Sequence, residues 1–194
     1  MKKLLLMMFT LVLTFSFVGG ASAQDDNMMM KKGDNPMVGG AMMYKTKNIV
    51  ENAMNSADHE TLVAAVKAAG LVETLSGKGP FTVFAPEDDA FDDLPDGTVE
   101  TLLKPENKMM LQNILKYHVV AGKYDSKKIM KAIKKGNGKA MLKTVSGGTL
   151  TAMMDGDDLV VMDEKGGKAT VEIADVKQSN GYIHSIDAVL MPAS

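Results

Sequence analysis

The segment Gly79–Phe91, with the sequence GPFTVFAPEDDAF, decides the fold of this chain. Its first part, Phe81–Ala85, is rich in aromatic and β-branched residues and predicts a short strand. Pro86 ends this strand, because proline has no N–H to donate to a sheet. The acids of Glu87–Asp89 follow and favour the start of a helix, where the helix dipole places partial positive charge. The segment therefore predicts a sharp corner from strand to helix.

Two later segments complete the pattern that begins with this corner. The first is Tyr117–Val120 (YHVV), and the second is Asn180–Pro192 (NGYIHSIDAVLMP). The three segments, in this order, resemble the sequence boxes of the fasciclin domain family over roughly Lys47–Pro192. The resemblance implies a small β-sandwich or folded β-sheet with several helices packed on one side. It also implies an extracellular adhesion or matrix-interaction module that is not an enzyme and has no cofactor.

Helical patterns dominate the first part of the chain. Apolar residues recur at helical spacing over Thr61–Ala69, where we expect Asp58 to cap the helix and Gly70 to end it. Another helix is expected to begin at Asp125–Ser126 and to end at Gly136.

Strand patterns dominate the last part of the chain. Asp155-Gly156 lies between two β-rich runs and predicts a hairpin, and a final strand is expected over Tyr182–Leu190. An earlier, isolated strand is expected over Tyr117–Val120. Helices first and strands later indicate an α+β fold class.

The chain is expected to have three parts. Residues 1–23 resemble a bacterial signal peptide: two lysines precede the apolar run Leu4–Val18, and Ala21–Ala23 is an A-x-A cleavage site. Residues 24–46 are rich in Met, Asp and Gly and are expected to be a flexible leader. Residues 47–192 form a single domain. We expect export to the periplasm, the cell surface or the medium, with no transmembrane segment after cleavage.

Composition excludes several classes of function. The chain has no cysteine, which rules out disulfides, thiol catalysis and thiolate metal sites. All 22 basic residues are lysine, the formal net charge is −2, and there is no tryptophan. Without arginine forks for phosphate and guanine, nucleic acid is not an expected partner. A lysine-rich stretch around Lys127–Lys135 has two interpretations, a solvated helix face or a surface for an anionic polymer.

Tyr117 and His118 are the candidate residues for adhesion. The fasciclin resemblance implies this role, since the tyrosine-histidine pair of that family has been implicated in adhesion. The alternative is a packed pair whose polar ends hydrogen-bond to the backbone. The partner is expected to be an extracellular protein or polysaccharide, and the sequence sets neither its identity nor the oligomeric state.

The methionine-rich leader suggests a second hypothesis, periplasmic copper handling. Thioethers are soft ligands that suit Cu(I), and an exported chain without thiols has few other soft donors. The candidate ligands are Met28, Met29, Met30, Met37, Met42 and Met43. The alternative is a linker in a chain that is rich in methionine throughout, with 18 of its 194 residues. A third hypothesis is a structural component of an envelope or matrix assembly.

Overall fold

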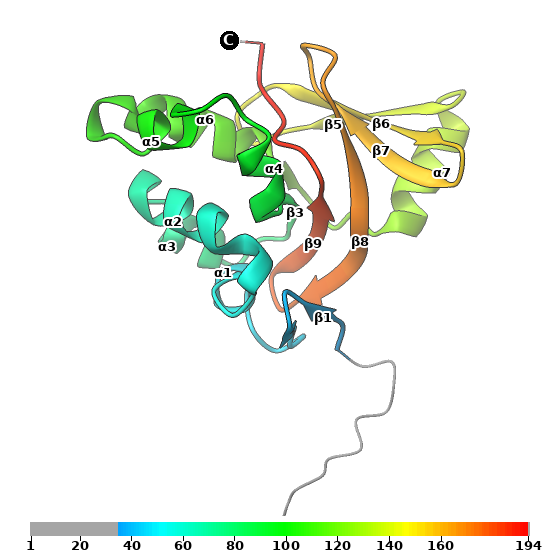
Figure 1. The fold of residues 1–194 in the computed structure, drawn as a ribbon. Coiled ribbons are helices and arrows are strands. Elements are labelled where there is room, and N and C mark those ends of the chain that lie inside the picture. The colour runs from blue at the N-terminus through cyan, green and yellow to red at the C-terminus, as the bar shows by residue number, and fades with distance from the viewer. Residues whose placement is uncertain (1–34, 194) are drawn as a thin grey trace, which may run out of the picture. The chain divides into compact units, whose positions relative to one another are not determined.

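The structure, a computed structural model, describes residues 35–193 (Figure 1). The expected signal peptide at 1–23 and residues 24–34 of the expected leader lie outside the described residues. The helical elements are α1 (Ile49–Ala53), η1 (Ala57–His59), α2 (Glu60–Ala69), α3 (Val72–Ser76), α4 (Asp88–Asp92), α5 (Thr98–Leu102), η2 (Pro105–Asn107), α6 (Lys108–Tyr117) and α7 (Ser126–Lys135). The strands are β1 (Met37–Val38), β2 (Ala41–Met42), β3 (Phe81–Pro86), β4 (Val119–Ala121), β5 (Lys139–Lys143), β6 (Thr149–Asp155), β7 (Asp158–Met162), β8 (Lys168–Gln178) and β9 (Gly181–Ile186).

Within residues 35–193, one large mixed sheet organises the domain. Seven strands follow the order β4-β3-β9-β8-β7-β6-β5, and only the β3–β9 pair is parallel. The sheet bends until its two ends nearly meet: Val120 forms an isolated bridge with Thr144, and the N–H of Val145 donates to the carbonyl of Val119 at 2.7 Å. The α+β fold expected from the sequence is confirmed.

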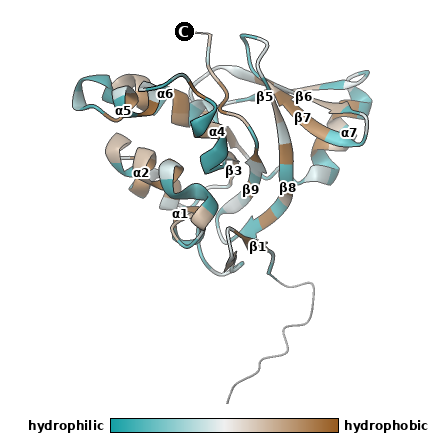
Figure 2. Cartoon of the chain, viewed as in Figure 1, coloured by the Kyte–Doolittle hydropathy of each residue, from teal (hydrophilic) through white to brown (hydrophobic). Residues whose placement is uncertain are grey.

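The folded sheet separates two hydrophobic cores. Because side chains alternate along a strand, Val83 and Ala85 of β3 face the core shared with helices α1–α3 and α6. Phe84 faces the opposite way, into a second core that includes Ile129 and Ile133 of α7. In Figure 1, α1–α6 lie beside β3 and β9, whereas α7 lies at the far side beside β5 and β6. Figure 2 shows hydrophobic and hydrophilic residues alternating along β8.

Two glycines permit the close parallel pairing of β3 with β9. Gly79 precedes β3 with φ of +55°, and an added Cβ there would lie 2.3 Å from the carbonyl oxygen of Asn180. A Cβ on Gly181 would lie 1.9 Å from the carbonyl oxygen of Phe81. Only glycine allows both backbones to approach this closely. The first and last sequence boxes are therefore adjacent strands of one sheet.

Helix boundaries follow the expected caps at three of four places, and one of these is Gly136, which is the C-cap of α7. Gly70 ends α2 in the left-handed conformation, and the Asp125 side chain accepts from the N–H of Lys128 at the start of α7. The expectation that Asp58 caps α2 is wrong. The carboxylate of Asp88, on α4, instead accepts from the first N–H groups of α2, those of Glu60 and Thr61.

Residues 37–43 differ from the flexible leader expected for this stretch. Strands β1 and β2 form a small antiparallel hairpin. Val38 and Met43 are buried in the core beside α1, which explains why this segment is held on the domain. Asn52 of α1 also accepts from the N–H of Tyr44 at 2.9 Å and donates to its carbonyl at 2.8 Å.

Candidate functional site

The tyrosine-histidine pair lies at a helix end and not on a strand. Tyr117 is the last residue of α6 and His118 is its C-cap, with its N–H directed at the carbonyl of Ile114 at 3.3 Å. Strand β4 begins one residue later, at Val119. The expectation of a strand over the whole of Tyr117–Val120 is therefore wrong for the first two residues, because the apolar stripe of α6 continues to its end.

Tyr117 links α6 to the strands of the second core. Its side chain is fully buried, and its hydroxyl donates to the carbonyl of Thr149 at 2.9 Å and accepts from the N–H of Glu164 at 3.0 Å. Burial raises the pKa of Tyr117 to about 12. An added Cβ on Gly148 would lie 2.6 Å from the tyrosine ring, so this strand start is shaped around the aromatic side chain.

His118 ties the C-terminal segment to α6. Its Nε2 accepts from the N–H of Leu190 at 3.0 Å, which leaves the proton on Nδ1, where it is donated to the carbonyl of Ile114 at 2.9 Å. Burial lowers the pKa of His118 to about 4, so the ring is neutral at neutral pH. Both ring nitrogens are therefore occupied within the domain.

The other two histidines are also buried and hydrogen-bonded. His184 donates from Nε2 to the carbonyl of Tyr124 at 2.8 Å and stacks on Phe84 with ring centroids 5.5 Å apart. His59 lies within hydrogen-bond distance of the hydroxyls of Ser56 (2.9 Å) and Ser185 (3.0 Å). Burial lowers the pKa of both rings.

Asn180, the first residue of the last sequence box, has a structural role that the sequence did not predict. Its Oδ1 accepts from the N–H of Ile49 at 3.0 Å, and its Nδ2 donates to the carbonyls of Leu75 and Gly77 at 2.8 and 2.9 Å. One buried amide thus joins α1, the end of α3 and β9. The Asn180-Gly181 dipeptide indicates a turn, but the residues that bind the Asn180 side chain lie more than a hundred positions earlier in the chain.

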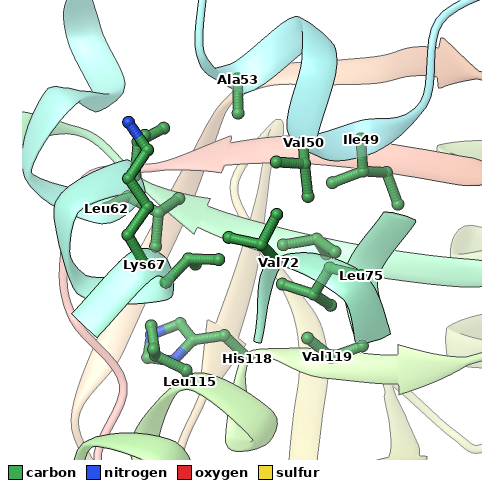
Figure 3. Close-up of a pocket in the computed structure, with 13 residues that line it drawn as sticks. Ile49, Val50, Ala53, Leu62, Lys67, Val72, Leu75, Leu115, His118 and Val119 are labelled. Atoms are coloured by element: carbon green, nitrogen blue, oxygen red, sulfur yellow. The ribbon is translucent and has the colours of Figure 1, made fainter. Parts of the chain in front are cut away.

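An apolar pocket lies beside the pair. Figure 3 shows Val50 of α1 facing Leu115 and His118 across it, with Val72 between them. The cavity measures about 40 Å³ and its lining is almost entirely apolar. Pockets for drug-sized ligands measure about 300–1,000 Å³, so this one suits the tip of an apolar side chain.

The six methionines of the copper hypothesis are distributed over different environments. Met28, Met29 and Met30 lie outside the described residues. Met37 is 62% exposed and pairs across the hairpin with Met42, whereas Met43 is 2% exposed and belongs to the core. Among residues 35–193, no three His, Asp or Glu side chains gather as a metal site. The described helices are all too short or too polar to cross a membrane.

Comparison with known proteins places this geometry in a family. The fasciclin domain profile matches residues 57–192. Protein sll1483 of Synechocystis is 49% identical over 144 residues, which cover 74% of this chain and 73% of that protein. The cell surface glycolipoprotein MPB83 of Mycobacterium bovis is 35% identical over 145 residues, which cover 72% of this chain and 58% of that protein.

A solved structure shows the same fold. It contains a FAS1 domain pair from the insect cell adhesion molecule fasciclin I, and it matches with a TM-score of 0.65 at 20% identity. The match covers 75% of this chain and 51% of the solved chain. The three sequence boxes, the folded sheet that unites them and the profile match lead to one conclusion: this chain belongs to the fasciclin family.

Proposed function

We propose that this protein is an exported, non-catalytic adhesion module that binds cell-surface or matrix partners at low affinity. The observation that carries the proposal is the fasciclin domain over residues 57–192, which spans most of the chain. A relative with 35% identity is described as a cell surface glycolipoprotein, which supports a location outside the cell.

The chemistry of the buried histidines supports a non-catalytic role. A general acid or base needs a ring nitrogen within reach of a substrate. In His59, His118 and His184 both nitrogens already contact groups of the domain itself, and all three rings are at most 3% exposed. The histidines therefore serve the fold.

Tyr117 and His118 are proposed to act in adhesion indirectly, by holding neighbouring parts of the domain in place. Tyr117 is fully buried and His118 is 3% exposed, so a partner meets their neighbours first. His118 lines the apolar pocket with Leu115 and holds Leu190 of the C-terminal segment. Changes in this pair would act on adhesion through the pocket wall and the segment after β9.

Retention of cells by protein-coated beads tests the proposal. Beads carrying the purified protein are expected to retain cells of the producing organism, and albumin-coated beads are not. Tyr117→Phe removes the hydroxyl and keeps the ring packing; it is expected to weaken retention in step with a loss of folding stability, measured by urea unfolding. Retention no greater than that of albumin beads would refute the adhesion proposal. Weaker retention at unchanged stability would assign the pair a direct contact instead of a positioning role.

A further inference from the structure

Positive charge is concentrated on α7 and the strand that follows it. Residues 123–143 contain eight lysines and one carboxylate, that of Asp125, in a chain whose formal net charge is −2. All eight side chains are exposed: Lys123, Lys127, Lys128, Lys131, Lys134, Lys135, Lys139 and Lys143. A segment of formal charge +7 thus lies on a protein that is acidic as a whole.

The fold turns these lysines outward as a stripe. Ile129 and Ile133 anchor α7 in the second core, and both are buried. At 3.6 residues per turn, the five lysines of the helix fall within an arc of about 120° on the opposite side. The helix is therefore fixed in rotation, and the face that it presents to solvent is cationic along its whole length.

Carboxylates of the domain do not neutralise this stripe. Within residues 35–193, none of the eight lysines forms an ion pair; the Lys168–Asp155 pair lies elsewhere. The two carboxylates at the start of α7 have other partners, since Asp125 caps α7 and Asp175 accepts from the N–H and hydroxyl of Ser126. Lys128 is occupied, with its Nζ 4.0 Å above the Tyr124 ring.

A recess of about 620 Å³ continues the stripe at the end of α7. Its floor is a row of side chains across three neighbouring strands, because Met141 of β5 pairs with Thr151 of β6, which pairs with Met162 of β7. Lys135 and Lys139 also line it. Met141 is 78% exposed, so the recess offers thioether and methyl surface beside two cations.

We propose that the α7–β5 face binds an acidic polysaccharide, whose carboxylates lie along the lysine stripe and whose sugar rings enter the recess. This inference rests on the adhesion proposal and names its partner class. Nucleic acid is disfavoured, because no arginine or aromatic side chain lines the recess. A membrane surface is disfavoured, because the apolar side of α7, with Ile129 and Ile133, is already buried and cannot insert.

The test uses polygalacturonate as the probe, with neutral dextran as its uncharged counterpart, and measures binding by the purified protein at 50 and 500 mM NaCl. The test variant replaces Lys127, Lys131, Lys134 and Lys135 by Gln. The matched control makes the same change at four exposed lysines elsewhere, Lys104, Lys108, Lys165 and Lys177. A third variant, Met141→Glu, places a carboxylate in the recess and leaves every lysine in place.

We expect binding of polygalacturonate that weakens at high salt and is absent with dextran. The α7 variant should bind at least tenfold more weakly, Met141→Glu should also bind more weakly, and the control variant should stay within twofold of the parent. Equal losses in the α7 and control variants would overturn the inference, as they would reflect net charge alone. Equal binding of dextran, or no binding of polygalacturonate, would overturn it too.

Further measurements test which other partners bind the α7–β5 face. Dextran sulfate in place of polygalacturonate separates sulfate from carboxylate recognition, because it carries sulfates but no carboxylates. Tighter binding to vesicles of anionic lipid or to single-stranded DNA would overturn the polysaccharide assignment. So would a concentration-dependent dimer that the α7 variant abolishes, since the partner would then be a second copy. If beads retain cells but polygalacturonate does not bind, the adhesion proposal stands and this inference fails.

Discussion

Replacing Asn180 by alanine removes the side chain that joins three elements of the first core. The change deletes one acceptor and two donor hydrogens, and it leaves the N–H of Ile49 and the carbonyls of Leu75 and Gly77 without their partner. An unsatisfied buried polar group costs about 1–3 kcal/mol, and the contact with Gly77 is only partly buried. The expected loss of unfolding free energy is therefore about 3–6 kcal/mol.

Such a loss is large against the whole stability of the domain. Single domains unfold with about 5–15 kcal/mol, so Asn180→Ala should remove about a fifth or more of that total. Urea unfolding followed by circular dichroism measures it as a lower midpoint with an unchanged slope. Asn180→Asp should be at least as damaging at neutral pH, because a carboxylate would face the carbonyls of Leu75 and Gly77.

The neighbouring serine provides the control. Ser179 is exposed and only its backbone N–H takes part in a hydrogen bond, to the carbonyl of Lys47 at 2.9 Å. Ser179→Ala should change the unfolding free energy by less than about 0.5 kcal/mol. If Asn180→Ala cost no more than the serine control, the view of Asn180 as the joint between the helices and β9 would be wrong.

The remaining predictions concern pH, a hydroxyl, copper and export. The pKa of His118 is lowered from 6.5 to about 4, so the unfolded chain binds more protons than the folded one between these pH values. About 3 kcal/mol of unfolding free energy should therefore be lost as the pH falls from 6.5 to 4. A His118→Gln variant should show a flatter dependence of stability on pH. Tyr117→Phe should cost about 1–3 kcal/mol by urea unfolding, because the N–H of Glu164 and the carbonyl of Thr149 lose their partner. Under the copper hypothesis, replacing Met28, Met29, Met30, Met37 and Met42 by Leu should abolish the high-affinity phase of a Cu(I) titration. Replacing the exposed Met109 and Met110 by Leu should leave that phase unchanged. Identical titrations of the two variants would exclude the hypothesis. The exported protein should begin at Gln24 by N-terminal sequencing, and a start at Met1 would contradict the expected signal peptide.

Local features of the fold were predictable from the sequence. The glycine at 70, the capping aspartate at 125 and the Asp155-Gly156 turn each act through groups within a few residues, so a single segment contains the whole signal. The strand-to-helix corner at Pro86 is similar, because proline and the acids that follow it restrict their own backbone.

Long-range partners were not predictable in the same way. Asp88 caps a helix that begins 28 residues earlier, and this pairing displaced the cap expected from Asp58. The parallel register of β3 and β9 joins segments about one hundred residues apart, which no local pattern specifies. The hairpin of residues 37–42 is held by burial of Val38 and Met43, and a composition typical of a linker does not reveal that burial.

The candidate site also combines residues that the sequence could identify with contacts that it could not. The pair Tyr117 and His118 could be named from the sequence, but its burial depends on Thr149, Glu164 and Leu190, which arrive from distant strands and the C-terminal segment. The lysines of α7 could be counted, but the recess beside them exists only because β5, β6 and β7 align Met141 with Met162.

Adhesion of living cells tests the central claim most directly. The producing organism and a strain lacking this protein are allowed to settle on a surface, and the cells that resist a defined flow are counted. The account predicts that fewer deletion cells are retained and that purified protein added from outside restores the count, whereas the α7 lysine variant restores it less. Equal retention of the two strains, or a deficit that added protein does not repair, would contradict an adhesive function.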